Sequence, residues 1–499
     1  MPHFPSGTAV EKPHPGAAKP FIPQLNADMV AADSEPPHRG IFQMHVSSLD
    51  NMSMCIKRHI LGDFTLANRT PLRVLDVGGA DINGSYRQSF ECLNCEYSAT
   101  DMAEDSGPSI TQNDPYTLPF SDQTFDVVIS GQTIEHCEHF WLLFKEMVRV
   151  CKADGVLFLI APSAGEIHRF PVDCYRFLPD SYQALAKYAD VQLIDSWRDD
   201  HGPYRDMVGV FRSKGWSPTP TKSAPVIPLT KKQLQKEWAR DPDPKVEAIQ
   251  GPETTHSFIQ RVHDMLQPRQ YLEIGVFMGA SLRMAKCPAI GIDPDPQVPV
   301  DHPLREKIVQ TSSDEFFFEK QHESLRGKVD LVYIDGMHRI ENVLKDFMNI
   351  EGICHPGTVI MLDDILPNHP RQARRERDTQ YWTGDVWKIV EILRNHRPDL
   401  LLLPIDTSPT GTLLILGADP KNRTLWDLFD VVLYYWMKPK DPSSEFLTRK
   451  TALHPADPII DQVLKAVRAA WQNNPAPRSI APIKALYNDS LPRQIASLA

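Results

Sequence analysis

The sequence lacks several features that would each assign it to a broad class of protein. It has no run of about 20 apolar residues, the length that a membrane-spanning helix needs. Its start, "MPHFPSGTAVEKPHPG", lacks the basic, apolar and small-residue order of a signal peptide. Its net charge is −11 and its basic residues form no cluster, which argues against a nucleic-acid partner. We expect a cytoplasmic protein without a membrane span that acts on a small or neutral substrate.

Cysteine is also scarce, with eight residues in a chain of 499. Only Cys92 and Cys95, in "ECLNCEY", lie close together, and no second pair completes a set of four zinc ligands. We therefore expect reduced thiols. Whether the chains assemble into a homo-oligomer is left open.

Length and proline content predict more than one domain, because single cores stop growing at roughly 250 to 300 residues. Prolines gather at the start of the chain and again in "SKGWSPTPTKSAPVIPLT" at 213–230. The tail contains one amphipathic pattern, "IIDQVLKAVRAAWQ". The predicted parts are a disordered segment (1–40), a first domain (41–212), a proline-rich linker (213–245), a second domain (246–440) and a tail with one helix (441–499).

Both halves alternate short apolar runs with helical patterns, which is typical of a parallel sheet covered on both faces. The runs of the first half are "LRVLDVG", "CEYSATD", "FDVVISG", "GVLFLIAP", "VQLIDSW" and "MVGVFRS", and the second half repeats the plan from "QYLEIGV" to "GTLLILG". Short turns such as "TSPTG" at 407–411 predict that the last two strands pair antiparallel. The predicted fold class is α/β, with two tandem Rossmann-like doubly wound sheets.

The turn after the first strand of each half is rich in glycine: "DVGGADINGSY" at 76–86 and "EIGVFMGAS" at 273–281. Glycine lets a ligand approach the main chain closely. An acidic residue, Asp101 or Asp293, follows roughly 20 residues later, the spacing at which a carboxylate accepts hydrogen bonds from ribose hydroxyls. These features predict an adenosine-containing ligand in both halves. Neither turn has the spacing expected for a dinucleotide or ATP.

With these turns, residues 70–212 and 268–418 resemble class I S-adenosylmethionine-dependent methyltransferases, which have an acidic residue followed by a loose glycine turn. In the first half Ala80 stands where that family usually has its middle glycine. The resemblance implies a seven-stranded fold and S-adenosyl-L-methionine as cofactor. The cofactor-binding candidates are Asp76, Gly78, Gly79, Asp101 and Asp114 in the first half, and Glu273, Gly275, Gly279, Ser281, Asp293 and Asp314 in the second.

Three carboxylates and an imidazole follow two apolar runs of the second half, in "YIDGMH" (333–338) and "MLDDI" (361–365). Oxygen-rich clusters suit a hard divalent cation such as Mg²⁺. A divalent cation lowers the pKa of a bound hydroxyl, and a neutral histidine can then take its proton. These residues predict metal-assisted O-methylation. The alternative is that the aspartates are only turn residues at strand ends.

The same two motifs resemble metal-dependent O-methyltransferases that modify sugar hydroxyls on macrolides and related natural products. The resemblance implies that Asp335, Asp363 and Asp364 hold the metal and that His338 is the general base. Asp335, as a metal ligand, is then also a catalytic residue. In "YWTGDVWKIVEIL", Trp382 and Asp385 are substrate candidates, although a packed tryptophan and a helix cap explain them as well.

The first half has two further polar segments. In "GQTIEHCEHF" (131–140), Glu135, His136 and His139 resemble the Glu-x-x-Glu-His metal site of some methyltransferases, but Gln132 replaces the first glutamate. The segment "GEIHRFPVDCYRFLPDSY" (165–182) resembles bacterial methyltransferases associated with surface polysaccharides. It provides His168 as a candidate base and Arg169, Asp173 and Arg176 as substrate candidates. A loop-stabilising ion-pair network is the alternative.

Together these patterns predict a bifunctional methyltransferase that O-methylates hydroxyls of a sugar, a glycan or a glycosylated natural product. A second interpretation makes the first half a degenerate domain for substrate positioning or dimer contacts. A third makes the chain a non-catalytic scaffold that binds an S-adenosyl ligand. An NAD-dependent oxidoreductase is disfavoured by the spacing of the glycine turns.

Overall fold

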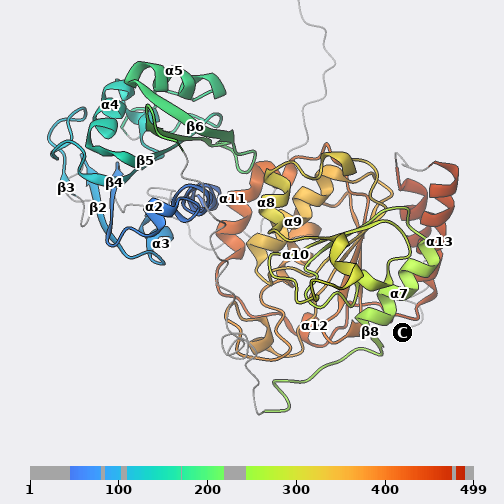
Figure 1. The fold of residues 1–499 in the computed structure, drawn as a ribbon. Coiled ribbons are helices and arrows are strands. Elements are labelled where there is room, and N and C mark those ends of the chain that lie inside the picture. Colours follow the sequence, from blue (N-terminus) through green and yellow to red (C-terminus); the bar gives the residue numbers. More distant parts are fainter. Residues whose placement is uncertain are drawn as a thin grey trace, which may run out of the picture. The chain divides into compact units, whose positions relative to one another are not determined.

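The computed structural model describes residues 45–79, 85–102, 110–169, 171–217, 243–474 and 479–488. These residues form two mixed seven-stranded sheets with helices on both faces, the first coloured blue to green and the second yellow to red in Figure 1. This confirms the predicted α/β fold class with two tandem doubly wound sheets. The predicted disordered segment 1–40 and most of the predicted linker lie outside the described residues.

The first sheet has the strand order β3-β2-β1-β4-β5-β7-β6. All neighbouring strands pair parallel except β7, which runs antiparallel to both β5 and β6. The strands are β1 (Leu72–Val77), β2 (Cys95–Asp101), β3 (Ile110–Thr111), β4 (Phe125–Gly131), β5 (Cys151–Ala161), β6 (Val191–Arg198) and β7 (Met207–Ser213). The helices are α1 (Val46–Ile56), η2 (Lys57–Leu61), α2 (Phe64–Ala67), α3 (Arg87–Phe90), η3 (Ile134–His136), α4 (Phe140–Val150) and α5 (Pro179–Ala189).

Alternation along the central strands builds a core on each face of this sheet, because successive strand side chains point to opposite faces. Val127 and Ile129 of β4 pack with Met52 of α1, whereas Val128, between them, packs with Phe144 of α4. All five are buried. The continuous apolar runs in the sequence thus reflect strands that are covered on both sides.

The second sheet repeats the topology, with the order β11-β10-β9-β12-β13-β16-β14 and with β16 antiparallel to both of its neighbours. Its strands are β9 (Tyr271–Ile274), β10 (Ala289–Ile292), β11 (Ile308–Val309), β12 (Leu331–Ile334), β13 (Val359–Leu362), β14 (Leu401–Ile405) and β16 (Thr412–Leu416). A separate two-stranded ribbon joins β8 (Glu253–Thr254) to β15 (Thr407–Ser408). The antiparallel pairing predicted for the last two strands of each half is confirmed.

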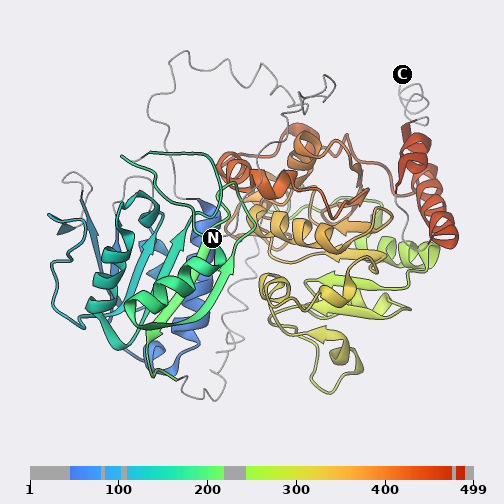
Figure 2. The same cartoon turned by 90° about the horizontal axis from the view of Figure 1, so that it is seen from above.

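Helices cover both faces of the second sheet (Figure 2). On one face lie α8, α9, α10 and α11, and on the other lie α7 and α13. The α-helices are α7 (Thr255–Leu266), α8 (Ser313–Phe318), α9 (Ile340–Ile353), α10 (Lys388–His396), α11 (Thr424–Trp436), α12 (Ser444–Leu447) and α13 (Pro458–Asn473). The short 3₁₀ turns are η4 (Leu282–Met284), η5 (Pro303–Lys307), η6 (Glu323–Leu325) and η7 (Pro370–Ala373).

The helix predicted in the tail exists as α13, and its apolar side is part of the second core. Val463, Leu464 and Val467 are fully buried and pack in one cluster with Tyr271 of β9 and Leu331 of β12. Asp457 caps the helix by accepting a hydrogen bond from the Ile459 backbone N–H at 3.0 Å. The tail helix therefore contributes to the stability of the second domain.

The eight cysteines are free thiols, as predicted. None of the described helices combines the length and the apolar character that a membrane span requires. The sequence patterns missed β3, β8 and β15, because two-residue strands are too short to show a periodicity.

We expect Leu464→Ala to destabilise the second domain by about 2–5 kcal/mol, the usual cost of a cavity left by a buried leucine. The free energy of unfolding, measured by denaturant titration, checks this. The matched control is Lys465→Ala, which truncates the exposed neighbouring side chain and should change stability by less than about 0.5 kcal/mol. Equal effects of the two variants would contradict the packing of α13 into the core.

Candidate functional site

The glycine turn after β9 lies directly against the end of β12. Gly275 has φ of 86°, and a Cβ atom there would lie 1.9 Å from the carbonyl oxygen of Asp335. Only glycine permits both this left-handed backbone and this approach. The Gly275 N–H donates to the Ile292 carbonyl at 2.9 Å, and the Asp335 N–H donates to the Ile274 carbonyl at 2.8 Å. The turn and the acidic motif thus form one continuous edge.

Two of the predicted cofactor residues hold this turn through their carboxylates. Asp293, at the end of β10, accepts hydrogen bonds from the backbone N–H groups of Val276 at 2.8 Å and Phe277 at 2.7 Å. Glu273 is fully buried and accepts from the hydroxyls of Ser281 at 2.6 Å and Tyr271 at 2.7 Å. Burial raises the pKa of Glu273 to about 8. These contacts give Asp293, Glu273 and Ser281 a role in shaping the turn.

Two other predicted cofactor residues of this half have packing and ion-pair roles. Gly279 has φ of 73° and lies against the Leu304 side chain. Asp314, in the first turn of α8, forms an ion pair with Lys345 of α9 at 3.0 Å. Among the described residues, no hydrogen bond or ion pair joins Asp314 to the glycine turn.

The acidic motifs bring three ligand-type side chains together. One ligand atom each from Asp335, His338 and Asp364 lies within 4.8 Å of the other two. His338 Nε2 is 3.5 Å from Asp335 Oδ1, and His338 Nδ1 is 3.1 Å from Asp364 Oδ2. Nδ1 also lies 2.8 Å from the Trp382 carbonyl, to which it can only donate. That bond orients Nε2 toward Asp335.

The charged groups of this cluster shift one another's pKa values. Burial raises the pKa of Asp335 and of Asp364, His338 opposes this shift in both, and the neighbouring carboxylates add to it. Burial alone would lower the pKa of His338, but Asp364 and Asp335 outweigh it and raise that pKa to about 9. The two carboxylates of the cluster carry like charges, and a cation would relieve their repulsion.

Asp363, the third predicted metal ligand, is turned away from this cluster. Its carboxylate accepts hydrogen bonds from three hydroxyls: Tyr333 at 2.6 Å, Thr412 at 3.2 Å and Thr255 at 3.4 Å. Burial, followed by the charge of Asp364, raises the pKa of Asp363 to about 7. Asp364 itself has φ of 64°, a left-handed conformation that aspartate tolerates better than most residues.

The two predicted substrate residues of this half have different surroundings. The Trp382 ring stacks on His338 with centroids 5.0 Å apart and an interplanar angle of 17°. Asp385 is buried and accepts from the Ile340 N–H at 2.8 Å, so it caps the start of α9. It also forms ion pairs with Arg375 at 2.8 Å and Lys388 at 3.1 Å. These bonds occupy the Asp385 carboxylate with structural contacts.

Gly384 also belongs to this cluster's surroundings, although it was not predicted from the sequence. Gly384 has φ of 54°, and a Cβ there would lie 1.7 Å from the His338 carbonyl oxygen. The glycine lets the segment that carries Trp382 approach His338. Its position in a "TGD" turn was the available signal.

In the first domain the corresponding turn also lies at the ends of the central strands. Asp76 is buried and accepts from the Tyr97 hydroxyl at 2.6 Å, and burial raises its pKa to about 7. Gly78 has φ of 79° and lies against the Thr133 side chain, and Gly79 lies against the Asp76 carboxylate. Ala80 and the following residues up to 84 lie outside the described residues.

Two acidic candidates of this half lie farther along the chain. Asp101 ends β2, and its carbonyl accepts from the Gln112 N–H at 2.8 Å. Asp114 is exposed and accepts from the Tyr116 N–H at 2.9 Å and the Thr117 hydroxyl at 2.8 Å. Asp114 therefore closes a local turn in this structure.

The predicted substrate loop of the first domain is held by an ion-pair network. Arg176 binds Asp173 with two hydrogen bonds of 2.6 and 2.7 Å and donates to the Glu166 carbonyl at 2.7 Å. Asp173 also accepts from the His168 N–H at 2.7 Å. Arg176 lowers the pKa of Asp173. Arg169 is exposed.

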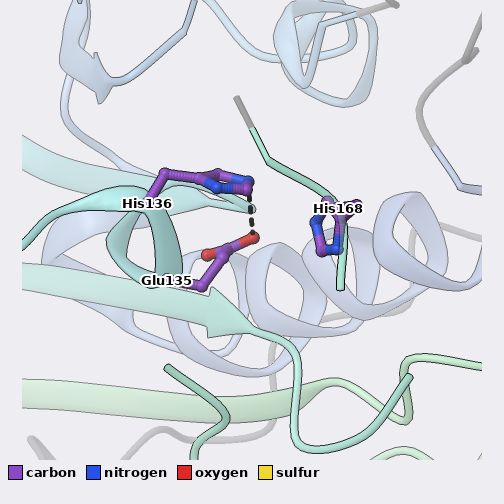
Figure 3. A group of neighbouring side chains, drawn as sticks. All are labelled: Glu135, His136 and His168. Carbon is purple, nitrogen blue, oxygen red and sulfur yellow. Dashed lines mark ion pairs between the residues drawn. The ribbon is translucent and has the colours of Figure 1, made fainter. Parts of the chain in front are cut away.

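His168 meets two residues that sequence reasoning placed in another motif. One ligand atom each from Glu135, His136 and His168 lies within 4.8 Å of the other two (Figure 3). His139 is exposed instead, with its ring against Tyr116 and Trp141. The side chain of Gln132, which replaces the first glutamate of the resembled motif, donates to the Ser48 hydroxyl at 3.4 Å.

Two segments of the chain match family models, each described as a methyltransferase domain. The first match covers residues 75–159 and the second covers residues 272–365. Each match begins within the first central strand of its sheet and includes the glycine turn that follows. The first match includes Glu135 and His136, and the second includes Asp335, His338 and Asp364. The chain therefore contains two domains of the methyltransferase type. A search of curated proteins found no significant match.

Several solved structures are similar to part of this chain. A 1,6-didemethyltoxoflavin-N1-methyltransferase from Burkholderia thailandensis, solved with S-adenosylhomocysteine, is 15% identical over 34% of this chain and 79% of its own, with a TM-score of 0.27. The YcgJ protein from Bacillus subtilis is 21% identical over 31% and 73%, with a TM-score of 0.25. A SAM-dependent methyltransferase from Aquifex aeolicus is 16% identical over 33% and 90%, also with a TM-score of 0.25. Similarities at this level assign no substrate to this chain.

We expect Gly275→Ala to destabilise the second domain far more than Gly327→Ala. Both glycines have positive φ, so each alanine adds left-handed strain of about 1–2 kcal/mol. A Cβ at 327 meets no atom within 4 Å, whereas one at 275 collides with the Asp335 backbone. Thermal unfolding of the two variants measures the difference. Equal melting temperatures would contradict the close contact between the turn and the acidic motif.

Proposed function

We propose that this protein is an S-adenosylmethionine-dependent O-methyltransferase with two catalytic-type domains, whose acceptor is a hydroxyl of a sugar, a glycan or a glycosylated natural product. The observation that carries the proposal is the cluster of Asp335, His338 and Asp364 beside the glycine turn of a methyltransferase domain. In such a fold the methyl donor and the acceptor meet at the carboxyl ends of the strands. The cluster lies at that edge.

The proposed cofactor-binding site of the second domain is the turn around Gly275. Its backbone is fixed from two sides, by Asp293 on the Val276 and Phe277 N–H groups and by the end of β12. Asp293 keeps Oδ1 on the N–H of Asp295 at 2.8 Å, so both of its oxygens define the local backbone. A carboxylate at this position suits the ribose hydroxyls of an adenosine ligand.

The side chains fit a divalent cation such as Mg²⁺. Carboxylates of Asp335 and Asp364 converge, and Asp363 adjoins Asp364 in the chain, so these three residues would hold it. Asp363 would have to leave its hydroxyl partners Tyr333, Thr412 and Thr255 to join them. When bound, the cation would supply an acidic centre that lowers the pKa of an acceptor hydroxyl.

His338 is proposed as the general base. Its Nδ1 is held by the Trp382 carbonyl, so Nε2 is the nitrogen that would take the acceptor proton. A bound cation would offset the charges of Asp364 and Asp335, which raise the pKa of His338 to about 9, and would thereby favour the neutral imidazole that a base requires. The acceptor oxygen then bonds to the methyl carbon of the sulfonium, and the carbon–sulfur bond breaks. Its electron pair stays on sulfur, and S-adenosylhomocysteine leaves. Holding oxygen, carbon and sulfur in line is the main task of the surrounding residues.

The same activity is proposed for the first domain, on the basis of its family match and its glycine turn. Asp76 and Gly79 lie in contact at the end of β1, and Asp101 ends the neighbouring strand β2. His168 is the candidate base of this domain, and the loop closed by Asp173 and Arg176 holds it near the strand ends. Arg169 and Trp382 are the candidate acceptor contacts of the two domains.

We expect calorimetric titration of the full chain with S-adenosylhomocysteine to show two sites per chain, falling to one in Asp293→Ala. Removing that carboxylate frees two N–H groups of the turn and one proposed ribose contact. The counterpart Asp101→Ala should instead remove the site of the first domain. Two unchanged sites in Asp293→Ala would contradict its role, and no binding to the unaltered protein would contradict the proposed cofactor.

We expect Asp335→Ala to abolish Mg²⁺-dependent methylation of hydroxylated sugar acceptors while leaving the affinity for S-adenosylhomocysteine within about threefold, because the lost carboxylate belongs to the metal and not to the turn. Methyl transfer from labelled S-adenosylmethionine and calorimetry measure the two quantities. The control Asp301→Ala removes an exposed carboxylate of the same domain and should keep the Mg²⁺ dependence. Unchanged Mg²⁺-dependent transfer in Asp335→Ala would remove the metal from the mechanism.

A further inference from the structure

The first domain contains a group of metal-ligating side chains apart from the acidic cluster of the second. Glu135 and His136 lie in η3, which follows β4, and His168 lies in the loop after β5. Figure 3 shows the Glu135 carboxylate directed toward His136, with His168 approaching from its own segment. One carboxylate and two imidazoles therefore converge at the carboxyl ends of two neighbouring parallel strands.

Glu135 is buried, and no other described residue donates a hydrogen bond to its carboxylate. The residue is 0% exposed, and neither Oε1 nor Oε2 has a partner among the described residues. His136 Nε2 is 3.6 Å from Oε1, which is too long for a hydrogen bond. A buried carboxylate in this state is costly, and native structures usually satisfy it with a partner or an ion. A cation between Glu135 and the imidazoles would supply the missing partner.

His136 is oriented as metal-binding histidines usually are. Its Nδ1 lies 2.6 Å from the Val172 carbonyl, to which it can only donate. The proton therefore resides on Nδ1, and the lone pair of Nε2 faces Glu135. The His168 ring meets the His136 ring edge-on, with centroids 4.9 Å apart and an angle of 89°. Both imidazoles are thus in place beside the carboxylate.

The spacing of the ligand atoms already suits an ion. Two ligands that bind a tetrahedral Zn²⁺ at roughly 2.0–2.1 Å lie about 3.4 Å from each other. Glu135 Oε1 and His136 Nε2 are 3.6 Å apart, and all three ligand atoms lie within 4.8 Å. An ion could therefore enter with small side-chain adjustments.

We infer that Glu135, His136 and His168 form a binding site for a divalent transition-metal ion. Two imidazoles and one carboxylate favour ions of the Fe²⁺ to Zn²⁺ series over Mg²⁺, which prefers oxygen ligands. Three protein ligands leave coordination positions open, as in catalytic rather than structural sites. His168 then acts as a ligand, which replaces its proposed role as a free base.

The neighbouring charges leave this site open to a cation. Arg176 is the nearby guanidinium that acts on Glu135, and it is bound to Asp173 through both of its terminal nitrogens. Its Nη2 also lies 3.3 Å from His168 Nδ1. Asp206 is a further buried carboxyl that acts on Glu135, and its Oδ1 also has no partner among the described residues. The positive charge of Arg176 is thus balanced by Asp173 before a cation enters.

The position of the group suggests what its open positions would bind. Thr133, two residues before Glu135, contacts Gly78 of the proposed cofactor turn. The cluster follows β4, just as Asp335 and His338 follow β12, the strand at the same place in the second sheet. The open positions would take an oxygen of the methyl acceptor. That last step rests on the proposed function, whereas the metal site itself does not.

The test uses the full chain with Asp335→Asn and Asp364→Asn, which removes the acidic cluster of the second domain. We expect titration with Co²⁺ to give one bound ion per chain, detected by calorimetry and by the visible absorption of Co²⁺. In this background Glu135→Gln and His168→Gln should each weaken Co²⁺ binding by at least roughly tenfold. Absence of Co²⁺ binding, or equal binding in Glu135→Gln, would overturn the inference.

Matched controls lie in the same segment. Glu138→Gln and His139→Gln make the same chemical changes at exposed neighbours and should keep the Co²⁺ affinity. An intense near-ultraviolet band from thiolate ligation would show that cysteines bind the ion instead, which would also overturn the inference. S-adenosylhomocysteine titration of the same samples separates the two claims. Cofactor binding without Co²⁺ contradicts only this site, and Co²⁺ binding without cofactor contradicts only the proposed methyl transfer.

Discussion

The cluster of Asp335, His338 and Asp364 in the second domain depends on the parallel register of β9, β12 and β13. Ile274 pairs with Ile334, and Ile334 pairs with Leu362, so the three strands end at one level. The next residues along each strand are Gly275, Asp335 and Asp363. Since neighbouring strands lie only about 4.8 Å apart, these residues share one edge without any loop having to place them. Gly275 is required there because the Asp335 backbone occupies the space of a side chain.

The first sheet applies the same constraint with different side chains. β1 pairs with β4 and β4 with β5, so the glycine turn, Glu135 and the start of the His168 loop follow adjacent strand ends. In both domains a histidine after the corresponding strand ties Nδ1 to a backbone carbonyl and turns Nε2 toward a carboxylate. The ligand chemistry differs, because carboxylates dominate one group and imidazoles the other. The two proposed sites would therefore prefer different cations.

Much of this arrangement could be predicted from sequence, because it depends on patterns along one strand and its turn. Runs of Val, Ile and Leu predicted the central strands, and with them the location of Asp335 and Asp364 at strand ends. Contacts between distant segments could not be predicted. Asp363 turns toward hydroxyls on β12, β16 and α7, and His168 meets Glu135 and His136 across two loops. Asp385 follows the same rule, since it caps α9 rather than the helix that follows it in the chain.

The segment that carries Trp382 is joined to His338 at three points. The Trp382 carbonyl holds Nδ1, its ring stacks on the imidazole, and Gly384 abuts the His338 carbonyl. A substitution that reshapes this segment will also change the orientation of the imidazole. Under the proposed function, acceptor preference and the proton affinity of His338 would therefore change together. New specificities in descendants of this chain would have to arise elsewhere, or through paired changes that restore the orientation of His338.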